Sequence, residues 1–195
     1  KQTTDPYDTF EWIMNVVEKE NLKSNFNFIF GGTHVRDAYY SMKNKEIINL
    51  TNNIYKRGHS IGAHLSFNCF DNFNLIKEEI NLYKHHLNLN KIYQNKIITR
   101  MHYLRWSMPK TLIYLDKAGV DVDTSLGYSG ISGYRCGTCH PYLGFDTINY
   151  KLLNIRIYPL ILMDISLTSN TNLNFEDAYN VASDLRTKCR KVNGV

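Results

Sequence analysis

Short apolar segments alternate with amphipathic helical patterns along most of this 195-residue chain, and this alternation constrains the fold more than any other feature. Such alternation is typical of a parallel sheet covered by helices, because parallel strands need a crossover connection. Functional residues in such sheets lie beyond the carboxyl ends of the strands. The pattern predicts strands at 25–30, 59–66, 96–99, 120–124 and 155–164, and helices at about 43–57, 73–88 and 107–118.

The two ends of the chain depart from this alternation. A helix is expected first, with Asp5 as its N-cap and Pro6 at its first position, and no strand precedes it. A final helix begins after Asn174, and residues 192–195 then resemble the approach to another strand. The glycine-rich stretch before residue 150 has no clear period. We therefore expect an α/β fold of the irregular (β/α) barrel kind, incomplete at both ends.

Composition narrows the class of protein. Hydrophobic residues make up 43% of the chain and charged residues 21%, which is ordinary for a globular domain and excludes a disordered or low-complexity chain. The net charge of +5 comes from scattered lysines without a nucleic-acid-binding motif, so no nucleic-acid partner is expected. No run of 18 apolar residues predicts a membrane span. The length favours a single domain over 1–195.

The cysteines are few. Cys69, Cys136, Cys139 and Cys189 are too scattered for a disulfide framework. Cys136 and Cys139 form a CxxC, which is half of a zinc site, a redox pair or two reduced thiols in a loop. Residues 1–6 lack the apolar segment of a signal peptide, so the cytoplasm is favoured, while localisation and oligomeric state otherwise stay open.

The strongest local signal is the sequence GHSIGAHLSFN, from Gly58 to Asn68, at the end of a predicted strand. His59 and His64 are five residues apart, so they point to opposite faces of a strand and are not expected to bind one metal together. His64 lies nearer the carboxyl end and is the candidate ligand, because neutral imidazole suits zinc and similar metals. Asn68 offers a weaker oxygen ligand or a hydrogen bond. The alternative for His64 is a hydrogen-bonded histidine at a strand end.

This segment resembles the G-H-E-I-G-x-H motif of the polysaccharide deacetylases, the NodB-homology enzymes of carbohydrate esterase family 4. The resemblance implies that His64 binds a divalent metal such as zinc, and that Asn68 stands where the family has its next histidine ligand. It places the chain in a divergent branch of that family. It also implies a barrel of the polysaccharide deacetylase type whose first and last motif strands lie outside residues 1–195.

Two further segments resemble motifs of the same family. The sequence RMHY, which begins at Arg100, resembles R-x-P-Y-G. By this resemblance Arg100 orients a catalytic aspartate, and the backbone N–H of Tyr103 contributes to an oxyanion hole. His102 replaces the proline and is a ligand, a proton donor or a packed aromatic. Asp123 resembles the family's strand-end aspartate and would face the site if Val122 faced the helices; a loop cap is the alternative.

Two functions remain open from the sequence. The resemblance implies a metal-dependent hydrolase that removes N-acetyl groups from a polysaccharide or glycan precursor, with its catalytic acid and base outside the given residues. The alternative is a non-catalytic carbohydrate-binding relative, which Asn68 favours. A carbohydrate is the expected partner in both cases, and the aromatic and arginine residues of 134–142 suit contacts with sugars.

Overall fold

A single mixed sheet organises the molecule. The computed structural model describes residues 5–168 and 173–194, and its six-stranded sheet has the order β1-β2-β3-β4-β6-β5. Neighbouring strands are parallel except for β5 and β6, which are antiparallel. The predicted α/β class is therefore confirmed. The strands are β1 (Asn25–Phe28), β2 (Ser60–Leu65), β3 (Ile98–Met101), β4 (Val122–Asp123), β5 (Tyr142–Asp146) and β6 (Lys151–Ile157).

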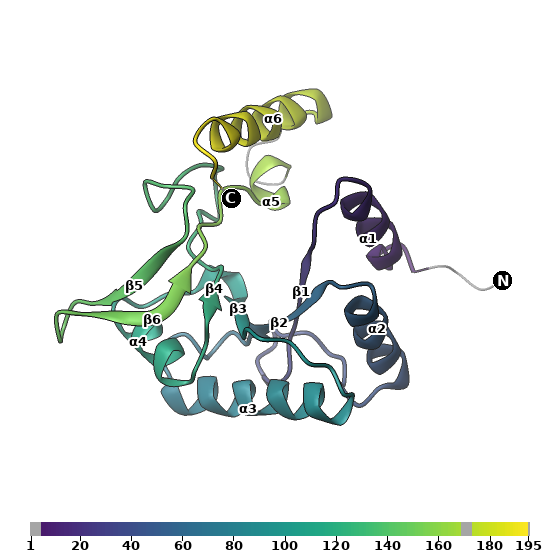
Figure 1. Ribbon diagram of the computed structural model, residues 1–195, viewed down its shortest axis with the longest axis vertical. Coiled ribbons are helices and arrows are strands. Elements are labelled where there is room, and N and C mark those ends of the chain that lie inside the picture. The colour runs from purple at the N-terminus through teal and green to yellow at the C-terminus, as the bar shows by residue number, and fades with distance from the viewer. Residues whose placement is uncertain (1–4, 169–172, 195) are drawn as a thin grey trace.

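Helices connect the parallel strands. Figure 1 shows the strands in an arc, with α2, α3 and α4 along its outer side and α6 at the opposite end of the view from α3. None of the described helices is long and apolar enough to cross a membrane. The helices are α1 (Phe10–Lys19), α2 (Lys45–Lys56), α3 (Phe73–Leu89), α4 (Lys110–Lys117), α5 (Asp164–Leu167) and α6 (Phe175–Lys191), with a short 3₁₀ turn, η1 (His102–Leu104), after β3.

The sheet is open rather than closed over the described residues, with β1 and β5 as its edges. Residues 5–168 and 173–194 therefore form no closed barrel, where the sequence predicts a barrel that is incomplete at both ends. The antiparallel β5–β6 hairpin is a further correction, because the sequence predicted one strand at 155–164 and no period before residue 150. In β6 every second residue from Leu153 is buried, including Ile155 and Ile157, whereas the described residues after 157 form no strand.

The core fills the space between the sheet and the helices. On β2, Ile61 and Leu65 are completely buried, and Ile76 of α3 and Met101 of β3 are equally inaccessible. Burial of each such side chain contributes about 1.5–3 kcal/mol. Helix α3, which supplies Ile76, begins at its predicted position and ends one residue beyond it. At its start the side chain of Asn72 accepts hydrogen bonds from two backbone N–H groups.

The first helix begins later than predicted. Asp5 accepts hydrogen bonds from the backbone N–H groups of Tyr7 and Asp8 and so closes a separate turn, and α1 begins only at Phe10. The last helix begins as predicted, with Asn174 Oδ1 accepting from Asp177 N–H at 2.9 Å. The expected approach to a further strand ends in a turn after α6, and its final residue, at position 195, lies outside the described residues.

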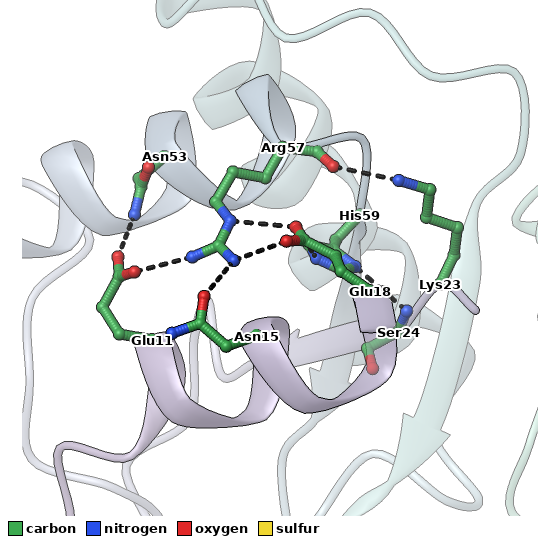
Figure 2. Close-up of polar contacts among 8 residues, drawn as sticks. All are labelled: Glu11, Asn15, Glu18, Lys23, Ser24, Asn53, Arg57 and His59. Carbon is green, nitrogen blue, oxygen red and sulfur yellow. Dashed lines mark hydrogen bonds and ion pairs between the residues drawn. The ribbon is translucent and has the colours of Figure 1, made fainter. Parts of the chain in front are cut away.

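A polar network fixes α1 to the beginning of β2 (Figure 2). Arg57 donates to both carboxylate oxygens of Glu18, at 2.9 and 2.7 Å, and to Glu11 at 2.6 Å. His59 Nδ1 accepts from Ser24 N–H, so the ring hydrogen lies on Nε2, which donates to Glu18 Oε1 at 3.1 Å. The first histidine of the GHSIGAH segment is thus fully engaged in holding the fold together.

Candidate functional site at the carboxyl ends of β2 and β3

Two histidines meet where β2 and β3 end. The parallel register places His64 beside Arg100, two residues before His102. His64 Nε2 lies 2.8 Å from His102 Nδ1, with the two rings at 80° to each other. His102 Nε2 lies 2.7 Å from the carbonyl oxygen of Arg36 and therefore donates to it. With both rings neutral, His102 Nδ1 is then the acceptor and His64 Nε2 the donor.

The surroundings of His64 keep its imidazole uncharged. Burial, together with the nearby His102 and Arg100, lowers the pKa of His64 to about 4, and Asp37 acts in the opposite direction. At neutral pH the ring is therefore in its neutral form. A neutral imidazole is the form that binds a transition metal or accepts a proton.

Asn68 does not join the histidine pair. Its side chain is exposed and lines a separate cavity of about 170 Å³ together with Asp37, Ser66 and Glu79. The two oxygens of Asp37 accept hydrogen bonds from backbone N–H groups, Oδ1 from Phe67 and Oδ2 from His34. The predicted His64–Asn68 ligand pair is therefore not assembled in this arrangement, and His102 occupies the place beside His64.

The histidine pair fits part of a zinc site. Zinc binds imidazole nitrogen at about 2.0–2.1 Å in tetrahedral geometry, which sets two such nitrogens roughly 3.3 Å apart. The observed 2.8 Å is a hydrogen-bonding distance, so a movement of roughly half an ångström separates the two arrangements. Within the residues that the structure describes, no group of three histidine, cysteine, aspartate or glutamate side chains could hold a metal. The described residues thus supply two nitrogens and no third ligand.

Asp123 lies on the other face of the sheet from the histidine pair. It is in register with Thr99, and side chains alternate along β3, so Asp123 and Arg100 project from opposite faces. Val122, in register with Ile98, shares the face of Arg100. The condition that we set from the sequence, with Val122 toward the helices and Asp123 toward the site, is therefore not met.

The buried carboxylate of Asp123 is saturated with hydrogen bonds. It accepts from the Thr99 hydroxyl at 2.9 Å and from the N–H and hydroxyl of Ser125 at 2.8 and 2.9 Å. Burial raises its pKa to about 6, although these donors act in the opposite direction. On the opposite face, Arg100 Nε donates to Thr124 Oγ1 at 3.1 Å. These contacts hold the loop after β4 against β3, and a catalytic role for Asp123 stays a prediction.

Tyr103 stands at the exposed rim of the site. Its φ of 57° is the left-handed conformation, which costs a residue other than glycine about 1–3 kcal/mol and is concentrated at functional sites. The side chain is 56% exposed. Its ring meets those of His102 and Phe67 edge-on, with centroids at 4.7 and 5.6 Å. An exposed aromatic ring next to the histidine pair is suited to contact a sugar.

An arginine–aromatic cluster adjoins the pair, and the sequence did not predict that its residues come together. The guanidinium carbon of Arg36 lies 5.4 Å from the ring centroid of Phe67 and 5.3 Å from that of Tyr103. The guanidinium carbon of Arg105 lies 4.0 Å from Phe67 and 3.9 Å from Phe70. Sequence reasoning did not single out Arg36, because its loop is 66 residues from His102 and no local pattern joins them.

The two thiols of the CxxC motif contact different groups. Cys136 Sγ donates to the carbonyl of Leu126 at 3.7 Å. Cys139 is buried against Cys189 of α6, and this burial raises its pKa. The hydroxyl of Tyr134 lies 3.5 Å from Cys189 Sγ. Among the described residues all four cysteines are free thiols, and the two CxxC thiols do not form a common site.

Comparison with known proteins supports the fold. No family model and no curated protein matches this sequence. Among solved structures, the crystal structure of a "putative polysaccharide deacetylase" from Mycobacterium smegmatis is similar, with a TM-score of 0.63 and 13% sequence identity. The alignment covers 97% of this chain and 62% of that protein, so the chain spans less than two thirds of its structural neighbour. The chain therefore has a polysaccharide deacetylase-like fold.

Proposed function

We propose that this chain contributes the histidine ligands of a metal-dependent site that removes N-acetyl groups from a glycan. The observation that carries the proposal is the convergence of His64 Nε2 and His102 Nδ1, 2.8 Å apart, at the carboxyl ends of neighbouring parallel strands. Active sites of parallel α/β sheets lie at this edge. The deacetylase-like fold makes an acetylated sugar the substrate to test first.

In this proposal His102, rather than Asn68, is the partner of His64. A histidine that binds a metal almost always donates its second ring N–H to a carboxylate, a carbonyl or water, which fixes the ring orientation. His102 has such a partner in the carbonyl oxygen of Arg36, and this hydrogen bond turns Nδ1 toward His64. A bound zinc ion would polarise the amide carbonyl and lower the pKa of bound water.

The other predicted residues support the pair in different ways. Arg100 is held by Thr124 on the same sheet face as His64, from which it can orient an acidic group of the site. The exposed ring of Tyr103 offers a stacking surface for the sugar, and its backbone N–H remains the predicted oxyanion donor. In this proposal Arg100 positions a group of the site and Tyr103 contacts the substrate, and neither takes a proton.

The test measures the affinity of the metal-stripped chain for zinc by calorimetry. We expect His64→Ala and His102→Ala each to weaken zinc binding at least about tenfold, since each removes one of two nitrogen ligands. Asn68→Ala is the matched control and should bind zinc as the wild type does. Wild-type affinity in His102→Ala, or a loss in Asn68→Ala, contradicts the proposal.

A second candidate is carbohydrate binding without catalysis. It is favoured by the observation that the described residues bring no third metal ligand to the histidine pair. Two measurements separate the candidates: release of acetate from N-acetylated oligosaccharides, and binding of the same sugars with and without a chelator. Binding that is unaffected by chelator, with no acetate released, favours the second candidate.

A further inference from the structure

We infer that the glycan bound at this site carries an anionic group, a carboxylate or a phosphate, and that Arg36 and Arg105 recognise it. The inference rests on the proposed function, because it names the substrate class of the same site. It is carried by the arrangement of the two guanidinium groups around Phe67, next to the histidine pair.

The backbone of Arg36 and the aromatic rings connect this cluster to the histidine pair. The carbonyl of Arg36 accepts the hydrogen bond from His102, so the residue that carries one guanidinium group is joined directly to the proposed ligand. Arg105 follows η1, three residues after His102, and its Nη1 donates to the carbonyl of Phe67 at 2.6 Å. Both guanidinium groups lie within 5.5 Å of the Phe67 ring centroid, at 5.4 and 4.0 Å.

The positive charge of this cluster is not compensated by the protein. Among the described residues, ion pairs involve Arg57, His59 and Lys188, and none involves an arginine of the cluster. The nearby carboxylate of Asp37 accepts hydrogen bonds from two backbone N–H groups. The cations therefore remain available for a group brought by the ligand.

The geometry also leaves suitable donors free. A guanidinium group that lies over an aromatic ring uses its flat face, so its N–H donors still point outward in the plane. Arg36 is exposed, its guanidinium carbon lies over the rings of Tyr103 and Phe67, and its side chain makes no hydrogen bond to another described residue. Carboxylate and phosphate oxygens match the fork of such donors and form charge-assisted hydrogen bonds.

The experiment compares three sugars by calorimetry: a neutral N-acetylglucosamine oligomer, an oligomer that alternates N-acetylglucosamine with glucuronate, and N-acetylglucosamine 1-phosphate. We expect the wild type to bind at least one acidic sugar about tenfold more tightly than the neutral oligomer, with a preference that weakens as salt is raised. Tighter binding of the uronate oligomer identifies a carboxylate, and tighter binding of the phosphate sugar identifies a phosphate.

Three variants test whether Arg36 causes the preference for acidic sugars. Arg36→Gln should reduce it to less than about twofold, and Arg36→Lys should retain part of it, because lysine keeps the charge but lacks the fork. Arg186→Gln removes an exposed arginine of α6 and is the matched control. Equal wild-type affinity for neutral and acidic sugars overturns the inference, as does a preference that survives in Arg36→Gln.

The zinc measurement separates this inference from the proposed function. If zinc binding depends on His102 while neutral and acidic sugars bind alike, the proposed function stands and the inference is wrong. If acidic sugars bind through Arg36 while His102→Ala keeps its zinc affinity, the inference stands and the metal site is wrong.

Discussion

His59 and His64 lie at the two ends of β2, His59 directly before the strand and His64 near its carboxyl end, and they have different roles. At the beginning of the strand, His59 lies in a closed network in which Glu18 accepts from both His59 and Arg57 (Figure 2). At the carboxyl end, His64 meets a second imidazole, that of His102, and no carboxylate of the described residues accepts a hydrogen bond from His64. Four residues of strand therefore separate a histidine of the scaffold from a histidine of the candidate site.

The difference lies in how charge is compensated. At the beginning of β2, the hydrogen bonds from Arg57 lower the pKa of Glu18 to about 2. The guanidinium and the carboxylate therefore compensate each other's charge. At the other end, burial lowers the pKa of His64 to about 4, and the neighbouring arginines have no ion-pair partner among the described residues. A paired network favours stability, whereas an uncompensated one leaves binding capacity for a ligand.

The largest expected effect is on stability at the beginning of β2. The side chain of His59 is completely buried and packs edge-on against Phe26. His59→Ala removes this packing and leaves Ser24 N–H without its acceptor, so we expect a loss of about 3 kcal/mol in the free energy of unfolding, measured with urea. His64→Ala removes one hydrogen bond at the other end and should cost about 1 kcal/mol. Equal losses for both variants contradict the comparison.

A slightly smaller effect is expected from zinc on thermal stability. Saturating a site at a hundred times its dissociation constant stabilises a protein by about 2.7 kcal/mol. We expect zinc to raise the melting temperature of the wild type. It should also raise that of His59→Ala, which melts at a lower temperature without zinc, but not that of His64→Ala. A zinc response that survives in His64→Ala and disappears in His59→Ala reverses the roles assigned to the two ends.

The third effect is the response of the paired network to acid. Glu18 has a folded-state pKa of about 2, below its usual 4.5, so its contribution to stability is complete above about pH 4.5 and is lost as the pH falls toward 2. Glu18→Gln should remove this part of the pH dependence of unfolding. The measurement is the urea midpoint between pH 5 and 2.5. An equally steep decline in wild type and variant shows that Glu18 does not carry it.

The smallest effect is the titration of His64 itself. Its imidazole should titrate with a pKa of about 4 by nuclear magnetic resonance, below the usual 6.5. The unfolded chain takes up this proton first, so His64 makes the protein less stable as the pH falls from about 6.5 to about 4. His102→Ala should raise the pKa, because His102 lowers it in the wild type. A wild-type titration near 6.5 contradicts the burial of the ring.

The sequence predicted the helices and parallel strands better than the hairpin. The apolar pattern that predicts a helix at about 73–88 locates α3 within one residue of its observed end. The β5–β6 hairpin escaped prediction because β5 exposes Leu143 and Phe145, so apolar residues do not mark its buried face. The turn between the two strands, at 147–150, also contains none of the usual glycine signals.

The site was predictable only in its local parts. His64 was identifiable because it ends a strand, and His102 because it follows the next strand in a segment similar to a family motif. Their contact depends on the register of β2 and β3, and the contact with Arg36 depends on the path of a loop. Neither leaves a periodic pattern in the sequence, so the sequence left both Asn68 and His102 open as partners of His64.

The central claim is that His64 and His102 bind one metal ion together. X-ray absorption spectroscopy of the zinc-loaded chain tests it most directly, because imidazole ligands give a distinct scattering pattern around zinc. We expect two imidazole nitrogens at about 2.0–2.1 Å from the zinc in the wild type, and one in His102→Ala. A wild-type spectrum with fewer than two imidazoles, or one unchanged in His102→Ala, would contradict it.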